Sequence, residues 1–252
     1  SRIPPVMTRK RLDVALVERG LAPTRARARD AIDRGTVTVD GRVETRPAAP
    51  VGAEARIEIA DPAARWVSRA ALKLVGALDA FALSPEGRTC LDLGASTGGF
   101  TQVLLARGAV HVTAIDVGHG QLAPAVANDP RVTSIEGLNA RDLAADHLAA
   151  APDCVVADVS FISLALALPP ALDLAAPGAI GVFLVKPQFE VGRDHVGKGG
   201  VVRDEAAAEA AVDRIAALLE THGWRVLGRA EAAIAGADGN REHVLAAVKN
   251  GA

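Results

Sequence analysis

The stretch LDLGASTGGF, residues 91–100, decides the fold of most of this chain. With the two residues before it, it begins as an apolar strand, and its glycines then allow a tight turn in which a ligand can approach the backbone. A helical pattern, GGFTQVLLARG, follows directly. A strand, a glycine-rich turn and a helix in this order predict the ligand-binding edge of an open α/β sheet.

Strands and helices alternate along the chain after Trp66. The predicted strands lie in TCLDLGA, VHVTAIDVG, RVTSIEG, DCVVADVS, AIGVFLVK, WRVLGRAEAA and REHVLAAVK. Nearly continuous apolar strands predict a parallel, doubly wound sheet that is covered on both faces. The last two strands have no helix between them, so we expect an antiparallel strand at the end. The segment WVSRAALKLVGALDAF predicts a helix that enters this domain, with Ser68 as its cap. Another helix is expected through SLALALPPALDL.

The residues before Trp66 predict a smaller unit of two helices and short strands. KRLDVALVERG has helical spacing, and TRARARDAIDRG begins at a capping Thr24 and ends at Gly35. TVTVDGRVE predicts a hairpin around Asp40-Gly41, and EARIEIA supplies another strand. Residues 1–66 hold 13 Lys and Arg against 9 Asp and Glu, although the whole chain has a net charge of -2. We therefore expect this unit to bind a polyanion.

The composition predicts a soluble cytoplasmic protein. Half of the 252 residues are hydrophobic, but prolines and an aspartate break the most apolar region, residues 161–185, so no membrane span is expected. The start, SRIPPVMTRK, lacks the apolar core of a secretory signal. Cys90 and Cys154 lie in apolar strands, which favours reduced core residues over a disulfide or a metal site.

Basic residues gather at the starts of the two N-terminal helices. Arg25 and Arg29 fall four apart and face one way, which by itself also fits a solvated helix face. The order helix, helix, hairpin, with arginines opening the second helix, resembles the small α+β RNA-binding module of the alpha-L type. We assign RNA binding to these residues, to Arg69 and to cations of the glycine-rich loop after Lys186. The predicted set is Arg9, Lys10, Arg11, Arg25, Arg27, Arg29, Arg69, Arg193 and Lys198.

The glycine-rich turn indicates a nucleoside ligand, because Asp116 ends the next strand and is placed to bind ribose hydroxyls. A dinucleotide site would place a glycine at Ser96, so an NAD-dependent enzyme is the weaker alternative. With Asp92, the pattern D-x-G-x-S-x-G-G-F resembles the first motif of class I methyltransferases. This resemblance implies S-adenosylmethionine (SAM) as cofactor, with Asn139 beside the adenine. The predicted cofactor residues are Asp92, Gly94, Ala95, Ser96, Thr97, Gly98, Gly99, Phe100, Asp116, Val117, Asn139, Ala140 and Asp158.

Four charged residues stand at separate places in the larger domain. Lys73 lies on the entering helix, Asp158 and Lys186 end the fourth and fifth strands, and Glu242 begins the last strand. Ends of neighbouring parallel strands meet at one edge, so Asp158 and Lys186 are expected to pair, because a lone buried charge loses several kcal/mol of solvation. Each residue alone has a structural explanation. The ordered set resembles the Lys-Asp-Lys-Glu tetrad of FtsJ-like 2'-O-ribose methyltransferases.

The resemblance implies a catalytic role for these four residues. Methyl transfer to a ribose hydroxyl requires the oxygen to be held in line with the methyl carbon and to lose its proton. Lys186 would take that proton or stabilise the developing alkoxide, and the sequence leaves both roles open. Asp158 would orient Lys186, while Lys73 and Glu242 would position the ribose.

Segments across nearly the whole chain, among them WVSRAALKL, ADVSFISL, VKPQFE and GNREHVL, occur in the order found in one family. The chain resembles the TlyA family of rRNA (cytidine-2'-O)-methyltransferases, also labelled hemolysin A. The resemblance implies a cytidine ribose in small-subunit rRNA as target, in some members also one in large-subunit rRNA, and an influence on sensitivity to capreomycin-type antibiotics. Ala70 and Ala71 depart from the glycines common in the family, a change that favours the helix.

The expected architecture is therefore a class I SAM-dependent methyltransferase domain with a Rossmann-like doubly wound sheet, preceded by the RNA-binding module. We expect the module at residues 8–62, a linker at 63–68 and the FtsJ-like domain at 69–250. Ribosomal RNA or a ribosomal subunit is the expected partner, with no metal. The alternatives are a membrane-active hemolysin, for which the sequence offers neither a span nor a basic amphipathic helix, and a non-catalytic RNA-binding protein with a degenerate Rossmann domain.

Overall fold

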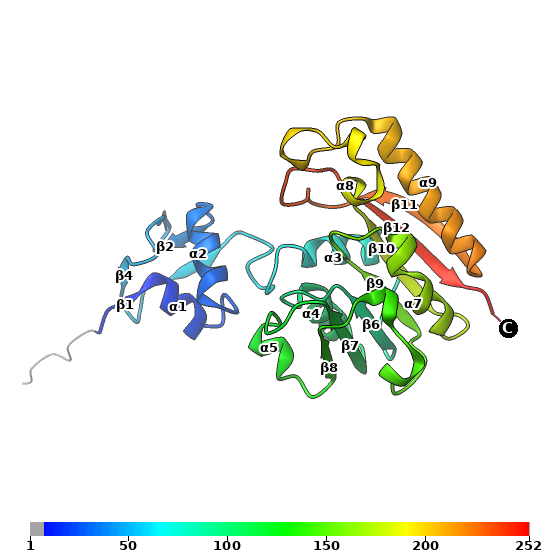
Figure 1. Cartoon of the computed structure of the whole chain (residues 1–252). Coiled ribbons are helices and arrows are strands. Elements are labelled where there is room, and N and C mark those ends of the chain that lie inside the picture. The colour runs from blue at the N-terminus through cyan, green and yellow to red at the C-terminus, as the bar shows by residue number, and fades with distance from the viewer. Residues whose placement is uncertain (1–7, 252) are drawn as a thin grey trace, which may run out of the picture. The chain divides into compact units, whose positions relative to one another are not determined.

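The computed structural model of the chain describes residues 8–251 and divides into two compact units, Ser1–Arg69 and Ala70–Ala252 (Figure 1). Residues 1–7, most of the stretch SRIPPVMTRK on which the expectation of no secretory signal rests, lie outside the described residues. Within residues 8–251, no helix combines the length and the apolar character that a membrane crossing requires.

The larger unit is built on a seven-stranded sheet in the order β11-β12-β10-β9-β6-β7-β8. Its strands are β6 (Thr89–Leu93), β7 (His111–Asp116), β8 (Val132–Glu136), β9 (Cys154–Ala157), β10 (Ile180–Val185), β11 (Trp224–Glu231) and β12 (His243–Lys249). Strands β6 to β10 pair in parallel, whereas β12 runs antiparallel to both β10 and β11. All seven predicted strands and the late antiparallel strand are confirmed.

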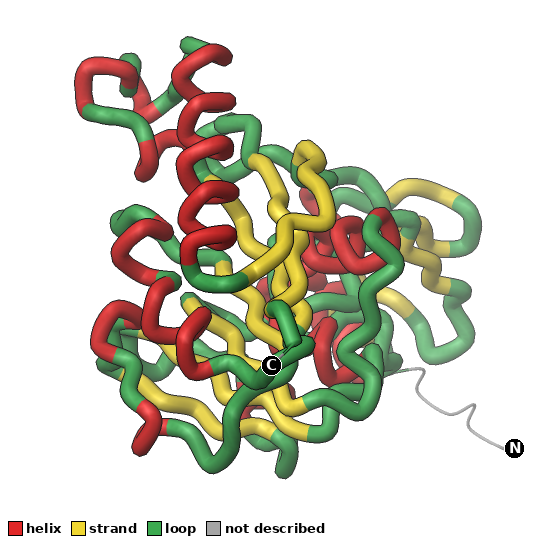
Figure 2. The backbone as a smooth tube through the Cα atoms, turned by 90° about the vertical axis from the view of Figure 1, so that its right-hand side faces the viewer, coloured by secondary structure: helices red, strands yellow, loops and turns green. Residues whose placement is uncertain are grey.

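Helices cover both faces of this sheet. They are α3 (Ala71–Ala80), α4 (Gly99–Ala106), α5 (Pro124–Ala127), α6 (Leu164–Ala167), α7 (Pro169–Leu174), α8 (Pro187–Glu190) and α9 (Glu205–Thr221), with short 3-10 turns at Ala140–Asp142, Ala145–His147, Arg193–His195 and Lys198–Gly200. Figure 2 shows the long helix α9 lying beside the strands, and it packs along β11 and β12. The parallel strands are therefore buried on both sides, which explains their continuous apolar sequence.

Alternate residues of β6 point to opposite faces of the sheet. Leu91 and Leu93 join the core beneath α6, α7 and α9. Asp92, between them, faces α4, where Thr101 contacts it. Cys90 and Cys154 are free and buried, and they lie opposite each other across β6 and β9. The prediction of buried, unbridged cysteines is confirmed.

Two helix predictions in the larger unit were wrong. The entering helix begins at Ala71 instead of Trp66, and its N-cap residue is Ala70, not Ser68. The helix expected through residues 163–174 is divided into α6 and α7 at Pro169. A proline has no N–H for the preceding turn but is tolerated in the first turn of a new helix, so the pair Pro169-Pro170 ends one helix and begins the next.

The smaller unit contains the two predicted helices, α1 (Leu12–Glu18) and α2 (Arg25–Asp33). Its strands are β1 (Lys10–Arg11), β2 (Val37–Val39), β3 (Arg42–Val43), β4 (Pro50–Val51) and β5 (Ile57–Ile59). Thr24 caps α2, since its Oγ1 accepts the Arg27 N–H at 3.2 Å. Asp40 and Gly41 have φ of 51° and 80°, the left-handed pair that a tight hairpin turn requires.

One element boundary in this unit was wrong. Lys10 and Arg11 were expected to open the first helix, but they form β1 and pair with β4. The strand β4 itself was not predicted, because only two of its residues pair and one of them is Pro50. The start of α1 is thus set by backbone pairing between β1 and β4. The spacing of residues within the helix gives no information about this pairing.

Candidate active site

The glycine-rich turn after β6 is fastened to β7 and passes close to the end of β9. The N–H groups of Gly94 and Ala95 both donate to the carbonyl of Ile115, at 2.9 and 3.0 Å. Gly94 has a φ of 78°, and a Cβ at this position would collide with the carbonyl oxygen of Asp158. Only glycine fits this close approach, so the turn and Asp158 are held together by backbone shape.

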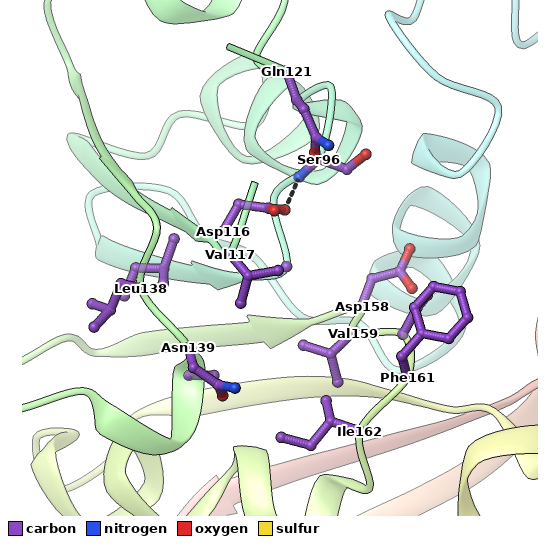
Figure 3. Close-up of a pocket in the computed structure, with 14 residues that line it drawn as sticks. Ser96, Asp116, Val117, Gln121, Leu138, Asn139, Asp158, Val159, Phe161 and Ile162 are labelled. Carbon is purple, nitrogen blue, oxygen red and sulfur yellow. Dashed lines mark hydrogen bonds between the residues drawn. The ribbon is translucent and has the colours of Figure 1, made fainter. Parts of the chain in front are cut away.

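A cavity of about 440 Å³ opens beside this turn (Figure 3). Its walls come from the segments that follow β6, β7, β8 and β9 at one edge of the sheet. They are Gly94, Ser96, Ile115, Asp116, Val117, Gln121, Leu138, Asn139, Ala140, Asp158, Val159, Ser160, Phe161 and Ile162. A mostly apolar cavity of this size with a few fixed polar groups suits a nucleoside-sized ligand.

Asp116 presents a fixed carboxylate to the cavity. Its Oδ2 accepts the Ser96 N–H at 2.7 Å, the dashed line in Figure 3, and its Oδ1 accepts the Gly118 N–H at 2.8 Å. A carboxylate oxygen has more than one acceptor site, so Asp116 can still bind ribose hydroxyls. Leu138 supplies an apolar wall next to Asn139, the residue predicted to lie beside the adenine. These groups suit SAM.

The predicted cofactor residues divide into two sets. Those that line the cavity are Gly94, Ser96, Asp116, Val117, Asn139, Ala140 and Asp158. The others shape the turn behind it: Asp92, Ala95, Gly98, Gly99 and Phe100 are buried, and the carbonyl of the exposed Thr97 accepts the Ala123 N–H at 2.9 Å. Direct cofactor contact by either set stays a prediction.

Half of the cavity lining was missed at the sequence level. The missed residues are Ile115, Gln121, Leu138, Val159, Ser160, Phe161 and Ile162. Three of them, Ile115, Leu138 and Val159, flank a predicted residue, and an apolar residue beside a strand end gives no sign of whether it faces the core or a ligand. The sequence did hold one signal, the family segment ADVSFISL, which contains four of the missed residues. In the structure, Phe161 of this segment is 91% exposed.

Lys186 and Asp158 form an ion pair at the same edge of the sheet. The Nζ atom of Lys186 lies 2.5 Å from Oδ1 of Asp158 and donates a hydrogen bond to Ser160 Oγ at 3.1 Å. Lys186 follows β10 and Asp158 follows β9, which are neighbouring parallel strands. The predicted proximity of the two residues is confirmed.

Lys73 and Glu242 form a second and more deeply buried ion pair. Lys73 Nζ lies 2.6 Å from Glu242 Oε2, with side-chain exposures of 7% and 2%. Glu242 immediately precedes β12, whose residue His243 pairs with Val185 of β10. Glu242, just before β12, and Lys186, just after β10, therefore lie at the same edge of the sheet on adjacent strands. The sequence did not indicate that the four charges would divide into these two pairs.

Asp92 is a fully buried carboxyl group behind the turn. Thr101 Oγ1 donates to its Oδ2 at 2.7 Å, and its Oδ1 has no hydrogen-bond partner within residues 8–251. Burial is the largest cause that raises the pKa of Asp92 to about 7, and the charges of Asp158 and Asp116 add to it. Negative charge at Asp92 is thus costly in the folded protein.

The predicted RNA-binding residues of the smaller unit differ in their surroundings. Arg27 donates to the carbonyls of Trp66 and Ala63 at 3.1 and 3.2 Å, and its side chain is only 13% exposed. Arg69 pairs with Asp61 at 2.7 Å. Both residues therefore have a structural role within this unit.

The other predicted cations lie at the surface. Lys10 pairs with Glu18, and Arg11 and Arg25 both contact the buried Asp13, whose pKa the Arg11 hydrogen bond lowers to about 2. Among the described residues, no ion pair is formed by the exposed Arg9 and Arg29. In the larger unit, Arg193 and Lys198 are exposed as well. RNA contact by these residues stays a prediction.

The sheet order, the antiparallel β12 and the cavity beside the glycine-rich turn define a class I SAM-dependent methyltransferase. The family model of FtsJ-like methyltransferases matches residues 66–249, and that of the S4 domain, the alpha-L RNA-binding module, matches residues 10–57. The chain is 48% identical over 238 residues to the 16S/23S rRNA (cytidine-2'-O)-methyltransferase TlyA of Mycobacterium tuberculosis, covering 94% of this chain and 89% of that relative. The chain belongs to the TlyA family of FtsJ-like rRNA methyltransferases, and its cofactor is SAM.

Two further relatives carry a hemolysin label. Hemolysin A of Brachyspira hyodysenteriae is 39% identical over 93% of this chain and 98% of its own length. A solved structure labelled a candidate hemolysin, from Streptococcus thermophilus, superposes with a TM-score of 0.75 at 36% identity, covering 97% of this chain and 90% of that one. The family resemblance inferred from the sequence is confirmed over almost the whole chain.

Removing one partner of the Lys73–Glu242 pair should destabilise the protein strongly. We expect Lys73→Met or Glu242→Met alone to lower the free energy of unfolding by about 3–5 kcal/mol, because the remaining charge stays buried without a partner. The double variant should recover much of this loss, since both charges are gone. Urea unfolding of the three variants and the unchanged protein measures it. Single variants as stable as the double variant would contradict a buried pair.

The pH dependence of stability should report on Asp92. Its folded-state pKa is about 7, above the ordinary 3.8, so the folded protein holds the proton more tightly than the unfolded chain. This carboxyl group therefore lowers the free energy of unfolding as pH rises from about 4 to 7. In Asp92→Asn, the free energy of unfolding should fall less over this pH range, by about 2 kcal/mol. Unfolding between about pH 5 and pH 8 tests it, with the exposed Asp142→Asn as control; equal profiles for Asp92→Asn and the unchanged protein would refute it.

Proposed function

We propose that this enzyme transfers a methyl group from SAM to the 2'-hydroxyl of a cytidine in ribosomal RNA, using Lys73, Asp158, Lys186 and Glu242. The observation that carries the proposal is the Lys186–Asp158 ion pair at the edge of the nucleoside-sized cavity. The Mycobacterium tuberculosis relative is named as a 16S/23S rRNA (cytidine-2'-O)-methyltransferase, which supports cytidine in these two rRNAs as the target. An influence on sensitivity to capreomycin-type antibiotics belongs to the same proposal.

The cofactor would lie along the strand ends, with the Asp116 carboxylate on its ribose and Leu138 and Asn139 beside its adenine. When bound, SAM supplies an electrophilic methyl group on a positively charged sulfur. Asp158, which also lines the cavity, would then lie between the cofactor and Lys186. The reacting ribose oxygen is expected on the Lys186 side of this carboxylate.

Lys186 is assigned the role of holding the ribose oxygen and stabilising its developing negative charge. An ammonium group has three N–H donors, and within the described residues Lys186 donates one to Ser160 Oγ and is ion-paired with Asp158. A remaining N–H can be donated to the 2'-oxygen. In this role the hydroxyl proton would pass to water as the bond from carbon to oxygen forms. Such preorganised charge stabilisation is a large term in many enzymes.

The Lys73–Glu242 pair supports this arrangement from the neighbouring strand. A Cβ at Gly236 would lie 2.7 Å from Glu242 Oε1, so this glycine leaves space for the carboxylate. Glu242 is thereby fixed next to the end of β10, from which Lys186 projects. We propose that the buried pair keeps the local charge balanced while the ribose is bound.

The S4 domain would hold the RNA through its exposed cations, including Arg9 and Arg29. We propose residues 8–62 as this RNA-binding module, residues 63–68 as the linker and residues 69–250 as the catalytic domain. Exposed guanidinium groups bind phosphates and position RNA without reading its sequence. Arg193 and Lys198 would add phosphate contacts beside the active site.

Lys186→Ala should lower the rate of rRNA methylation by about 10²–10³-fold, because the group that holds the alkoxide is removed. SAM affinity should change little, since Asp116 and the cavity walls are untouched. Transfer of a tritiated methyl group to purified ribosomal subunits measures the rate, and calorimetry measures SAM binding. A melting curve controls for folding. Full turnover by this variant would contradict the assignment of the tetrad.

The double substitution Arg9→Ala, Arg29→Ala should weaken rRNA binding in a salt-dependent way. Each lost phosphate contact is expected to reduce the slope of log affinity against log salt by about 1. Filter binding of rRNA fragments at several salt concentrations measures that slope. Arg46→Ala is the matched control, because Arg46 is exposed, pairs with Glu44 and lies outside the predicted set. An equal effect of both changes would argue against a specific surface.

A further inference from the structure

Glu190 is a partly buried carboxylate for which the proposed mechanism has no role. It ends α8, four residues after Lys186. Its Oε2 accepts the Ser163 hydroxyl at 2.6 Å, and its Oε1 accepts the backbone N–H of Leu164 at 2.8 Å. Both oxygens are thus directed at one short segment of the chain.

That segment is the start of α6, which leads away from Asp158. Ser163 is the N-cap of α6, and its Oγ in turn accepts the Ala165 N–H at 3.1 Å. The first N–H groups of a helix have no carbonyl partner within the helix, so Glu190 satisfies one of them. The contact connects the segment after β9 to the segment after β10, which carry Asp158 and Lys186.

Other contacts join the same two segments closer to the strand ends. Lys186 contacts Asp158 and Ser160, and the rings of Phe161 and Phe189 lie 5.1 Å apart at 55°. Phe161 has a φ of 64°, a conformation that non-glycine residues rarely adopt. A strained residue keeps such a backbone only when the structure on both sides holds it. Glu190 holds the residues on the C-terminal side of Phe161, through its hydrogen bonds with Ser163 and Leu164.

The surroundings of Glu190 favour a role beyond stability. Burial raises the pKa of Glu190 above its ordinary value, although the hydrogen bonds from Ser163 and Leu164 and the charge of Arg214 oppose this. Arg214, on α9, also donates to the Glu190 backbone carbonyl at 3.2 Å. The ionised carboxylate therefore costs folding free energy at neutral pH. A glutamine would accept the Leu164 N–H without that cost.

We propose that Glu190 is a positioning residue for methyl transfer, which holds residues 160–164 against α8 so that Asp158 and Lys186 keep their pairing. Through Ser163 and Leu164 it fixes the segment whose other end lines the cavity at Ser160 and Phe161. The inference rests on the proposed roles of Asp158 and Lys186 and deepens them.

The test compares Glu190→Ala and Glu190→Gln with Glu209→Ala, an exposed glutamate of α9, in the full chain. Glu190→Ala should lower kcat for rRNA methylation by about 10–100-fold, because small misplacements of reacting groups have effects of this order. The Kd for SAM should stay within about twofold, since Asp116 and Leu138 are unaffected. Glu209→Ala should leave both constants unchanged.

Glu190→Gln separates positioning from stability. Its amide oxygen can still accept the Leu164 N–H, so we expect it to recover part of kcat. Its Tm at about pH 8 should equal or exceed that of the unchanged protein, because the buried charge is absent. A merely structural residue would instead lose Tm and kcat together. Adding Ser163→Ala to Glu190→Ala should lower kcat little further, since both changes break the same contact.

Two results would overturn the inference: an unchanged kcat in Glu190→Ala, or a loss of activity that follows only the fraction of unfolded protein. Failure of the underlying proposal looks different. In that case the unchanged protein would not methylate rRNA, or Lys186→Ala would be as active as the unchanged protein. The Lys186 and Glu190 variants, assayed side by side on the same ribosomal subunits, therefore distinguish the two failures.

Discussion

The close approach of Gly94 to the backbone of Asp158 is the constraint on which the rest of the site depends. No side chain fits between the turn after β6 and the end of β9, so the two strand ends meet directly. That contact closes one wall of the cavity and fixes the backbone from which Asp158 projects. Asp116 then fastens the outer part of the turn through the Ser96 N–H. The proposed cofactor site and the proposed reaction site therefore share one backbone junction.

Buried charge imposes the second requirement. Ammonium and carboxylate groups at a partly dry sheet edge are stable only when paired, and the fold meets this with two separate pairs, Lys186–Asp158 and Lys73–Glu242. The antiparallel β12 has a direct part in this, because it brings Glu242 beside the end of β10. The last strand of the sheet thus completes the polar site as well as the core.

The seven strands of the large sheet, the glycine-rich turn and half of the residues that line the cavity were predictable from the sequence. Continuous apolar strands, the Thr24 cap and the Asp40-Gly41 turn each depend on a few neighbouring residues, and each is confirmed. One error is local, because the pair Pro169-Pro170 divides the predicted helix, whereas the start of the first helix depends on distant contacts. Lys10 and Arg11 pair with the distant strand β4. In the same way, the sequence did not show that Arg27 contacts the carbonyl of Trp66, 39 residues away. Local spacing carries no information about such partners.

The sequence by itself determined the class of fold, the cofactor turn and the identity of the four charged residues, because these follow from periodicity, from glycine geometry and from a family pattern. Only the tertiary structure decided that Lys73 pairs with Glu242, which motif residues reach the cavity, and that Glu190 is directed at the start of α6. The physical reason is that strand order brings together residues far apart in the chain. Lys73 and Glu242 are separated by 169 residues, yet their charged atoms lie 2.6 Å apart.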